Sequence, residues 1–165
     1  GKELSEENAA QTAKALNIIQ PDFIRVHATG IKLESKLGEF VRDGSFTLQS
    51  EEEIVIEQKL FLQQLHEMDS YYVNEHIVNL LLEVRGNLRT EKQEMLSTID
   101  RFLTLPPDER LLFTVGRRLN IFFRLDDLKK PKLHQKAGES LQQILSKNPH
   151  VDFAALCNYV RQSQI

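Results

Sequence analysis

Three polar side chains alternate along one short, otherwise mostly apolar stretch of the chain: Arg25, His27 and Thr29. Residues 22–28 favour a strand, in which every second side chain points to the same face. Binding sites gather at the ends of strands and in clefts beside them. Arg25, His27 and Thr29 are therefore candidates for lining a ligand cavity. The alternative is the solvent-facing side of an edge strand.

Two histidines, His66 and His76, and three carboxylates fall within residues 66–76, which invites a metal-site interpretation. The two histidines belong to different predicted elements, and neither forms the i, i+4 pair of a helical zinc site. We therefore interpret these residues as exposed or helix-capping polar groups, and we predict no metal ligands in the chain.

Residues 110–136 carry eight Lys/Arg and two Asp/Glu, a charge of +6 that leaves −9 on the rest of a chain whose total is −3. Such a segment could contact the phosphates of RNA or of a nucleotide. It could also be a solvated face, or pair with the acidic residues 51–57. We favour these two alternatives and do not expect nucleic acid as a partner. The candidate patch consists of Arg117, Arg118, Arg124, Lys129, Lys130 and Lys132.

Cys157 is the only cysteine, so no internal disulfide is possible and a cytoplasmic location is expected. It lies among apolar residues with no base near it in sequence, which indicates a buried structural thiol. The chain has no serine elbow, P-loop or dinucleotide-binding glycine motif. We predict no catalytic residue.

A chain of 165 residues with 41% hydrophobic and 27% charged residues is typical of one globular domain. No run of about 18 apolar residues is present, so we expect no membrane partner. The sequence predicts a mostly α-helical protein with a small β component. Helices are expected after Ser5, Ser35, Ser50, Asn74, Thr90, Pro107, Pro131 and Pro149.

Capping patterns support several of these helices. Ser50 with Glu53, and Thr90 with Gln93, have the spacing of a capping box. The segment after Asn74 is apolar almost all round, which predicts a central, buried helix. Residues 70–73 could form a short strand. Pro21 separates the first helix from the strand at 22–28, and together these make an αβ unit.

Two passages resemble the late barrel region and the tail of radical S-adenosylmethionine proteins. The first is PDFIRVHATGIKLESKLGEFVRDGSFTLQSEEEIVIEQ, which begins at Pro21. With the helix that leads into it (12–22), it resembles a family pattern of helix, strand (23–28), loop segment (35–37) and Gly44-Ser45-Phe46. The second runs from SYYVNEHIVNLLLEVRGNLRTEKQEMLSTID to RFLTLPPDERLLFTVGRRL. The resemblance covers roughly residues 1–128, and the family's CxxxCxxC cluster loop is absent from the chain.

The resemblance implies that the chain is the C-terminal, catalytically incomplete part of such an enzyme. It implies the end of a partial (β/α) barrel (1–48), a helical extension (49–128) and a C-terminal helical cap (129–165). This chain would hold no cofactor, while the full-length parent would hold a [4Fe–4S] cluster and S-adenosylmethionine. Arg25, His27 and Thr29 would then line the substrate cavity.

A barrel strand without its neighbours leaves an unpaired edge. We therefore expect residues 70–73 to pair with residues 22–28, or the edge to bind the missing N-terminal barrel half or a second copy of the chain. Two other functions remain open. The chain could be an independent helical protein-interaction module, or, less favoured, an RNA- or nucleotide-binding module.

Overall fold

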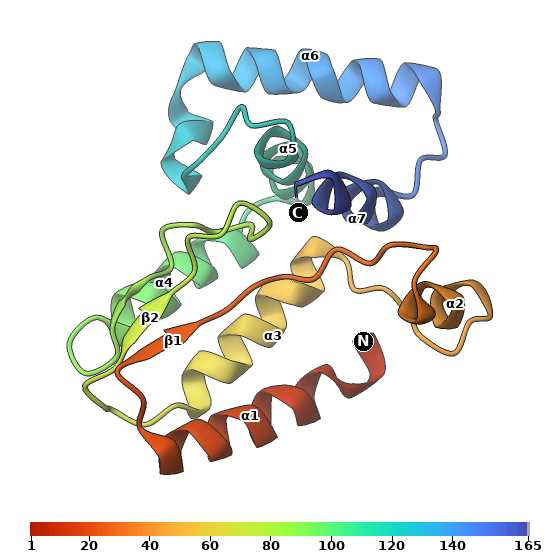
Figure 1. Ribbon diagram of the computed structural model, residues 1–165. Helices are drawn as coiled ribbons and strands as arrows, with labels where there is room; N and C mark the ends of the chain where they lie inside the picture. The colour runs from red at the N-terminus through yellow and green to blue at the C-terminus, as the bar shows by residue number, and fades with distance from the viewer. Residues whose placement is uncertain (165) are drawn as a thin grey trace.

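The computed structural model describes residues 1–164 and is mostly helical with one small sheet, as predicted (Figure 1). Two short 3₁₀ helices, η1 (Lys2–Leu4) and η2 (Leu125–Lys129), accompany seven α-helices. These are α1 (Ser5–Ile19), α2 (Lys36–Arg42), α3 (Glu51–Gln64), α4 (Lys92–Leu103), α5 (Pro107–Arg118), α6 (Pro131–Lys147) and α7 (Phe153–Ser163).

The sheet has the order β1-β2-β3. β1 (Phe23–Arg25) runs parallel to β2 (Tyr71–Val73), and β2 runs antiparallel to β3 (Gly86–Asn87). The expected pairing of residues 70–73 with the first strand is thus confirmed. That first strand is shorter than the predicted 22–28. The Val26 amide still donates to the Val73 carbonyl at 3.1 Å. Beyond it, the Val26 carbonyl and the Ala28 amide bind the side chain of Asn79 instead of a neighbouring strand.

The first helix, α1, packs through a face of small residues. Ala9 and Ala13 are buried in α1, and α1 packs against α3. Small side chains let the two helices approach closely. Ile24 of β1 is buried in the same core. The core therefore covers the face of β1 from which Ile24 points. Figure 1 shows α1 and α3 below β1, with α5, α6 and α7 above.

The Ser50–Glu53 capping box at the start of α3 forms as predicted. Ser50 Oγ accepts from the Glu53 amide at 3.2 Å, and the Glu53 carboxylate accepts from the Ser50 amide at 2.8 Å. The predicted box of Thr90 with Gln93 does not form. Glu91 stands at the N-cap of α4 and its carboxylate accepts from the Asn87 amide at 2.7 Å.

The helix predicted after Asn74 is absent, which is the main correction to the predicted fold. Residues 74–85 form an irregular buried loop, which we call the asparagine loop. Its apolar side chains do reach the core, as expected: Leu80, Leu81 and Val84 are at most 4% exposed. Asn74 and Asn79 are also buried. Their side chains donate to the carbonyls of Leu81 and Asn74, which helical hydrogen bonds would otherwise occupy.

The C-terminal helix α7 docks on the loop that follows β1. Asn158 donates to the Ile31 carbonyl at 3.1 Å and accepts from the Ile31 amide at 2.9 Å. Gly30 permits this contact, because a Cβ there would lie 2.9 Å from the Gln162 nitrogen. The last helix therefore packs on residues 30–31, more than 120 positions earlier in the chain. The division into 1–48, 49–128 and 129–165 remains a prediction.

Among residues 1–164, no helix combines the length and the apolar character needed to cross a lipid bilayer.

Candidate functional site

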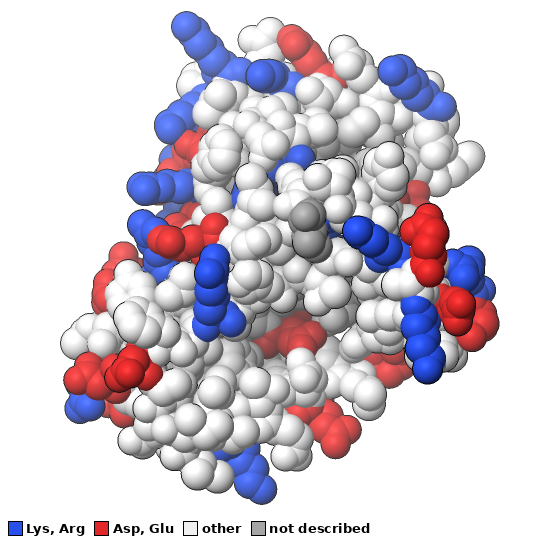
Figure 2. Space-filling view, in the orientation of Figure 1, with Lys and Arg blue, Asp and Glu red and all other residues white. Residues whose placement is uncertain are grey.

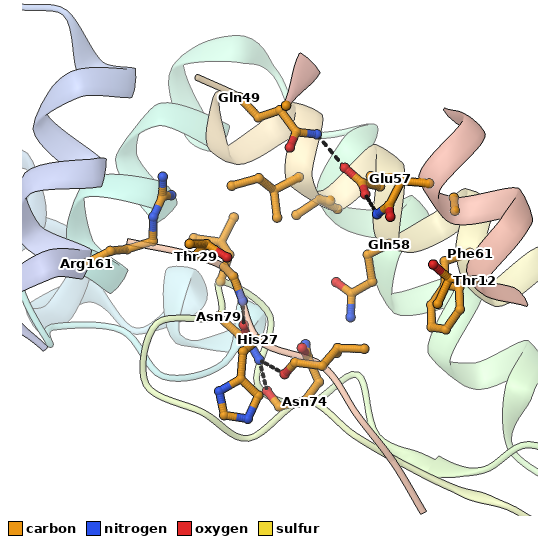
Figure 3. Close-up of a pocket in the computed structure, with 18 of the residues that line it drawn as sticks. Thr12, His27, Thr29, Gln49, Glu57, Gln58, Phe61, Asn74, Asn79 and Arg161 are labelled. Atoms are coloured by element: carbon orange, nitrogen blue, oxygen red, sulfur yellow. Dashed lines mark hydrogen bonds between the residues drawn. The ribbon is translucent and has the colours of Figure 1, made fainter. Parts of the chain in front are cut away.

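A cavity of about 380 Å³ lies beyond the carboxyl end of β1. Its walls come from α1, α3, α7 and the chain that leaves β1 (Figure 3). In Figure 2 the same face is hollowed between the upper helices and the α1 region, with acidic atoms inside the hollow. The walls mix apolar and polar side chains, which is the usual make-up of a small-molecule site.

Glu57 of α3 supplies an acid to the cavity. Asn8 of α1 donates to one carboxylate oxygen and Gln49 to the other, each at 2.6 Å. The two amides fix the carboxylate in place and occupy an acceptor site on each oxygen. Glu57 is therefore a positioned negative charge.

Gln58 and Tyr72 form a second polar pair in the cavity. The Gln58 side-chain amide donates to the Tyr72 hydroxyl at 3.0 Å. Tyr72 is completely buried, and this burial raises the pKa of its phenol well above the usual range. The hydroxyl therefore stays protonated and retains one donor.

Asn79 holds the cavity wall where the chain leaves β1. Its side-chain oxygen accepts from the Ala28 amide at 2.7 Å, and its nitrogen donates to the Val26 carbonyl at 2.8 Å and to the Asn74 carbonyl at 3.3 Å. One side chain thus continues the strand pairing past Val26. It sets the path of the segment that carries His27 and Thr29.

Arg161 of α7 lines the end of the cavity where Thr29 lies (Figure 3). It belongs to a buried group that we call the arginine cluster: Arg117 and Arg118 of α5, Arg161, and Glu51 of α3. All four side chains are at most 5% exposed. Arg118 binds the Glu51 carboxylate through Nε and Nη2, and Arg161 binds Glu51 through Nη1.

Arg117 is the member of the cluster that makes no hydrogen bond to Glu51. Its Nη2 donates to the carbonyls of Ile77 and Asn79 at 2.9 and 3.2 Å, and its guanidinium stacks 5.7 Å from the Phe123 ring centroid. Burial, followed by the positive charge of Arg118, lowers the pKa of Arg117 to about 10. At neutral pH it remains charged, so the interior carries excess positive charge.

Two of the three predicted cavity residues line the cavity. His27 and Thr29 are among its walls, and Arg25 on β1 does not line it; all three side chains are exposed. His27 also contacts His76, with ring centroids 4.3 Å apart. Burial lowers the pKa of His27, and the charges of His76 and Arg25 lower it further. This contact between residues far apart in sequence was not foreseen.

The predicted basic patch is only partly a surface. Arg117 and Arg118 are buried, which corrects their assignment to it, and Arg118 pairs with Glu51 as the alternative interpretation allowed. Lys129 and Lys130 lie 2.7 Å from Asp126 and Asp127. Arg124 and Lys132 are exposed. On the face in Figure 2, Lys and Arg lie mainly along the edges, with Asp and Glu among them.

Cys157 is buried on α7, as predicted. Burial, and next the charge of Glu51, raise the pKa of its thiol to about 12, so it stays protonated. Within residues 1–164, no three His, Cys, Asp or Glu side chains are placed to hold a metal ion together.

The residues that shape the site most strongly were missed in the sequence: Glu57, Asn79 and Arg161. Glu57 looks like an ordinary helix-surface acid, and Asn79 sits inside an apolar run. Arg161 lies on a helix whose sequence suggested no role. The one available signal was the pair of charges noted above, the acidic residues 51–57 and the basic residues after 110.

No protein-family model matches the chain, and no curated protein or solved structure is significantly similar to it. The interpretation of the site therefore rests on the geometry and chemistry of its own residues.

Proposed function

We propose that this chain is the C-terminal part of a radical S-adenosylmethionine enzyme, as the resemblance of residues 1–128 implies. It supplies the last strand of a barrel, one wall of the substrate cavity, and a helical cap. One observation carries the proposal: the cavity opens at the carboxyl end of β1, and β1 stands at the edge of its sheet. Active sites of (β/α) barrels lie at the carboxyl ends of their strands.

The two faces of β1 fit the wall of a barrel. Ile24 is buried in the core to which α1 and α3 contribute, while Phe23 and Arg25 on the opposite face are exposed. In a (β/α) barrel the helices cover the outside and the other face of each strand points to the interior. Phe23 and Arg25 would point into the barrel once further strands close it.

Apolar side chains around β1 also favour a missing neighbour. Phe23 is 70% exposed and contacts Tyr71, itself 40% exposed, with ring centroids 6.5 Å apart. Ile18 and Ile19, just before the strand, are 78% and 66% exposed. We take the missing barrel half as the partner of this edge, with a second copy of the chain as the alternative.

The cluster chemistry does not fit this chain. A [4Fe–4S] cluster needs several thiolates, and Cys157 is a single thiol, buried and protonated. We place the cluster, and the residues that bind S-adenosylmethionine at it, on another part of the parent protein. The role of this chain is to bind and enclose the substrate.

The two alternative functions have less support. The apolar faces of α3, α4 and α5 are buried in the core, so they offer no groove to a partner helix. The nucleotide-binding alternative needs Arg117 and Arg118 on the surface, but both side chains are buried.

The proposal is tested by expressing the chain anaerobically together with the coding sequence upstream of it. We expect a CxxxCxxC segment upstream and a brown protein that contains iron and sulfide. After reduction it should convert S-adenosylmethionine to 5′-deoxyadenosine. The 165-residue chain alone is the matched control and should contain no iron. A native protein that begins near residue 1 and is colourless would contradict the proposal.

A further inference from the structure

Arg161 has an unused hydrogen-bonding edge in the arginine cluster. Its Nη1 donates to Glu51, its Nε is buried without a partner, and its Nη2 donates to no group within residues 1–164. Nε and Nη2 form the side of the guanidinium that binds a carboxylate or phosphate through two parallel hydrogen bonds. Residues 1–164 therefore supply no partner to that side of Arg161.

Arg118 shows what the same edge does when it is occupied. Its Nε and Nη2 bind the two oxygens of Glu51, at 3.0 Å and 2.5 Å. Both arginines are 2–3% exposed and both touch the same carboxylate. The two arginines differ in their Nε/Nη2 edge. In Arg118 this edge holds the Glu51 carboxylate, whereas in Arg161 it holds no oxyanion from residues 1–164.

The charge balance of the interior also lacks an anion. Glu51 faces three guanidiniums, and although Glu83 lies near enough to raise the pKa of Arg117, two carboxylates leave one positive charge over. A buried charge without a partner is costly. Arg161 is the cluster member that lines the cavity, so an anion from outside can reach the cluster there.

The cavity places its own acid away from this end. Figure 3 shows Glu57 and Arg161 on different sides of the cavity, with Thr29 beside Arg161. Both oxygens of Glu57 already accept hydrogen bonds from Asn8 and Gln49. A ligand with an anionic group therefore meets attraction at Arg161 and repulsion at Glu57, which orients it in the cavity.

We propose that the cavity binds a ligand through a carboxylate or phosphate group held on the Nε/Nη2 edge of Arg161. Because Nε is buried, an anion entering from the cavity completes the fork by a rotation of the guanidinium. This deepens the proposed function by naming the chemistry of the substrate, and it rests on that function only for the role of the cavity. Binding of the anion itself needs no cluster and no barrel half.

The test is a titration of the ¹⁵N-labelled 165-residue chain with inorganic phosphate and, separately, with acetate, at constant ionic strength. We expect saturable shifts of the amide signals of residues 29–31 and 158–162. Saturation by phosphate alone identifies a phosphate ligand, and saturation by acetate identifies a carboxylate. Arg161→Lys keeps the charge but loses the fork, and should weaken binding at least about tenfold. Lys132→Gln, an exposed basic residue off the cavity, should leave binding unchanged.

Two results would overturn the anion site. One is the absence of saturable shifts at these amides of the wild-type chain with both anions. The other is equal binding by the wild-type chain and Arg161→Lys. The wild-type titration decides the question even if the variant fails to fold. An anion site in a protein that proves to have no upstream cluster segment would leave the cavity proposal standing and remove only the enzyme class.

Discussion

The asparagine loop buries Asn74 and Asn79, and the arginine cluster buries three arginines, but only the two asparagines are fully paired. In the same loop, one carboxylate oxygen of Glu83 is also buried without a partner. In the loop, Asn74 and Asn79 leave no buried side-chain atom without a partner. In the cluster, Arg117, Arg118 and Arg161 together leave four buried nitrogens unpaired: Nε and Nη1 of Arg117, Nη1 of Arg118 and Nε of Arg161.

The difference separates a structural from a functional use of polarity. Burying a hydrogen-bonded amide costs little free energy, and its hydrogen bonds hold the backbone in one conformation. Burying an unpaired guanidinium lowers the stability of the fold and holds no backbone in place. Residues that break the usual pairing rule are expected at functional sites. The comparison therefore assigns the loop to shaping the cavity and the cluster to binding within it.

Removing the carboxylate of the cluster is the strongest way to break this comparison. Glu51→Gln leaves Arg118 and Arg161 without their shared negative charge, and we expect a loss of about 3–5 kcal/mol of unfolding free energy, measured by urea denaturation. Glu52→Gln changes the neighbouring acid, whose side chain is 45% exposed near Arg110. This control should lose less than about 1 kcal/mol. Equal losses in the two variants would refute a special role for Glu51.

The asparagine loop is tested by Asn79→Ala. The change leaves the Ala28 amide and the Val26 carbonyl unpaired, and we expect a loss of about 2–3 kcal/mol. Amide exchange at Ala28 should accelerate in parallel. Gln142→Ala, an exposed amide on α6, serves as the control and should be neutral. Unchanged exchange at Ala28 would mean that Asn79 does not hold the cavity wall.

A smaller effect is expected at the start of α3, which carries Glu51 into the cluster. Ser50→Ala removes one half of the capping box and should cost about 1 kcal/mol in urea denaturation. Ser146→Ala, near the end of α6, lacks such a role and should change stability less. A larger loss for Ser146→Ala would show that the cap does not position the helix.

The smallest effect concerns His27. Because its pKa is lowered in the folded chain, the unfolded chain binds the proton more readily, and His27 destabilises the fold as pH falls below about 6.5. His76→Gln removes the second largest cause, so the pKa of His27 should rise part of the way to its ordinary value. An NMR titration of the His27 ring measures this, with His150→Gln as the control. An unchanged titration would show that the two rings do not interact.

Most helices could be predicted because local signals define them. Pro21, Ser50 and Pro107 mark boundaries that the structure keeps, and the Ala9/Ala13 face identifies how α1 packs. The helix prediction for residues 74–85 was wrong, because the apolar residues there do not follow a helical period that would define one buried face. The segment is held instead by tertiary partners, and those of Asn79 lie some fifty positions away, at Val26 and Ala28.

The site was harder to predict for the same reason. The predicted alternation of Arg25, His27 and Thr29 named two residues that line the cavity, but β1 ends at Arg25, so both follow the strand rather than lie on it. Their role in binding remains a prediction. Arg161 meets Glu51 across 110 positions, and a single sequence holds no sign of such a contact. The charge pattern indicated that basic and acidic segments could pair, but not that the pairing would be internal.

The buried thiol of Cys157 can be used to measure how often α7 detaches from the rest of the chain. It lies on α7 beside the arginine cluster, and in the closed state it is shielded and protonated. A thiol-alkylating reagent can therefore modify Cys157 only while α7 is detached. The rate of alkylation then measures how often α7 detaches. A bound anion that bridges α7 to the rest of the cavity would slow that rate. The same cysteine then measures ligand occupancy without any added probe.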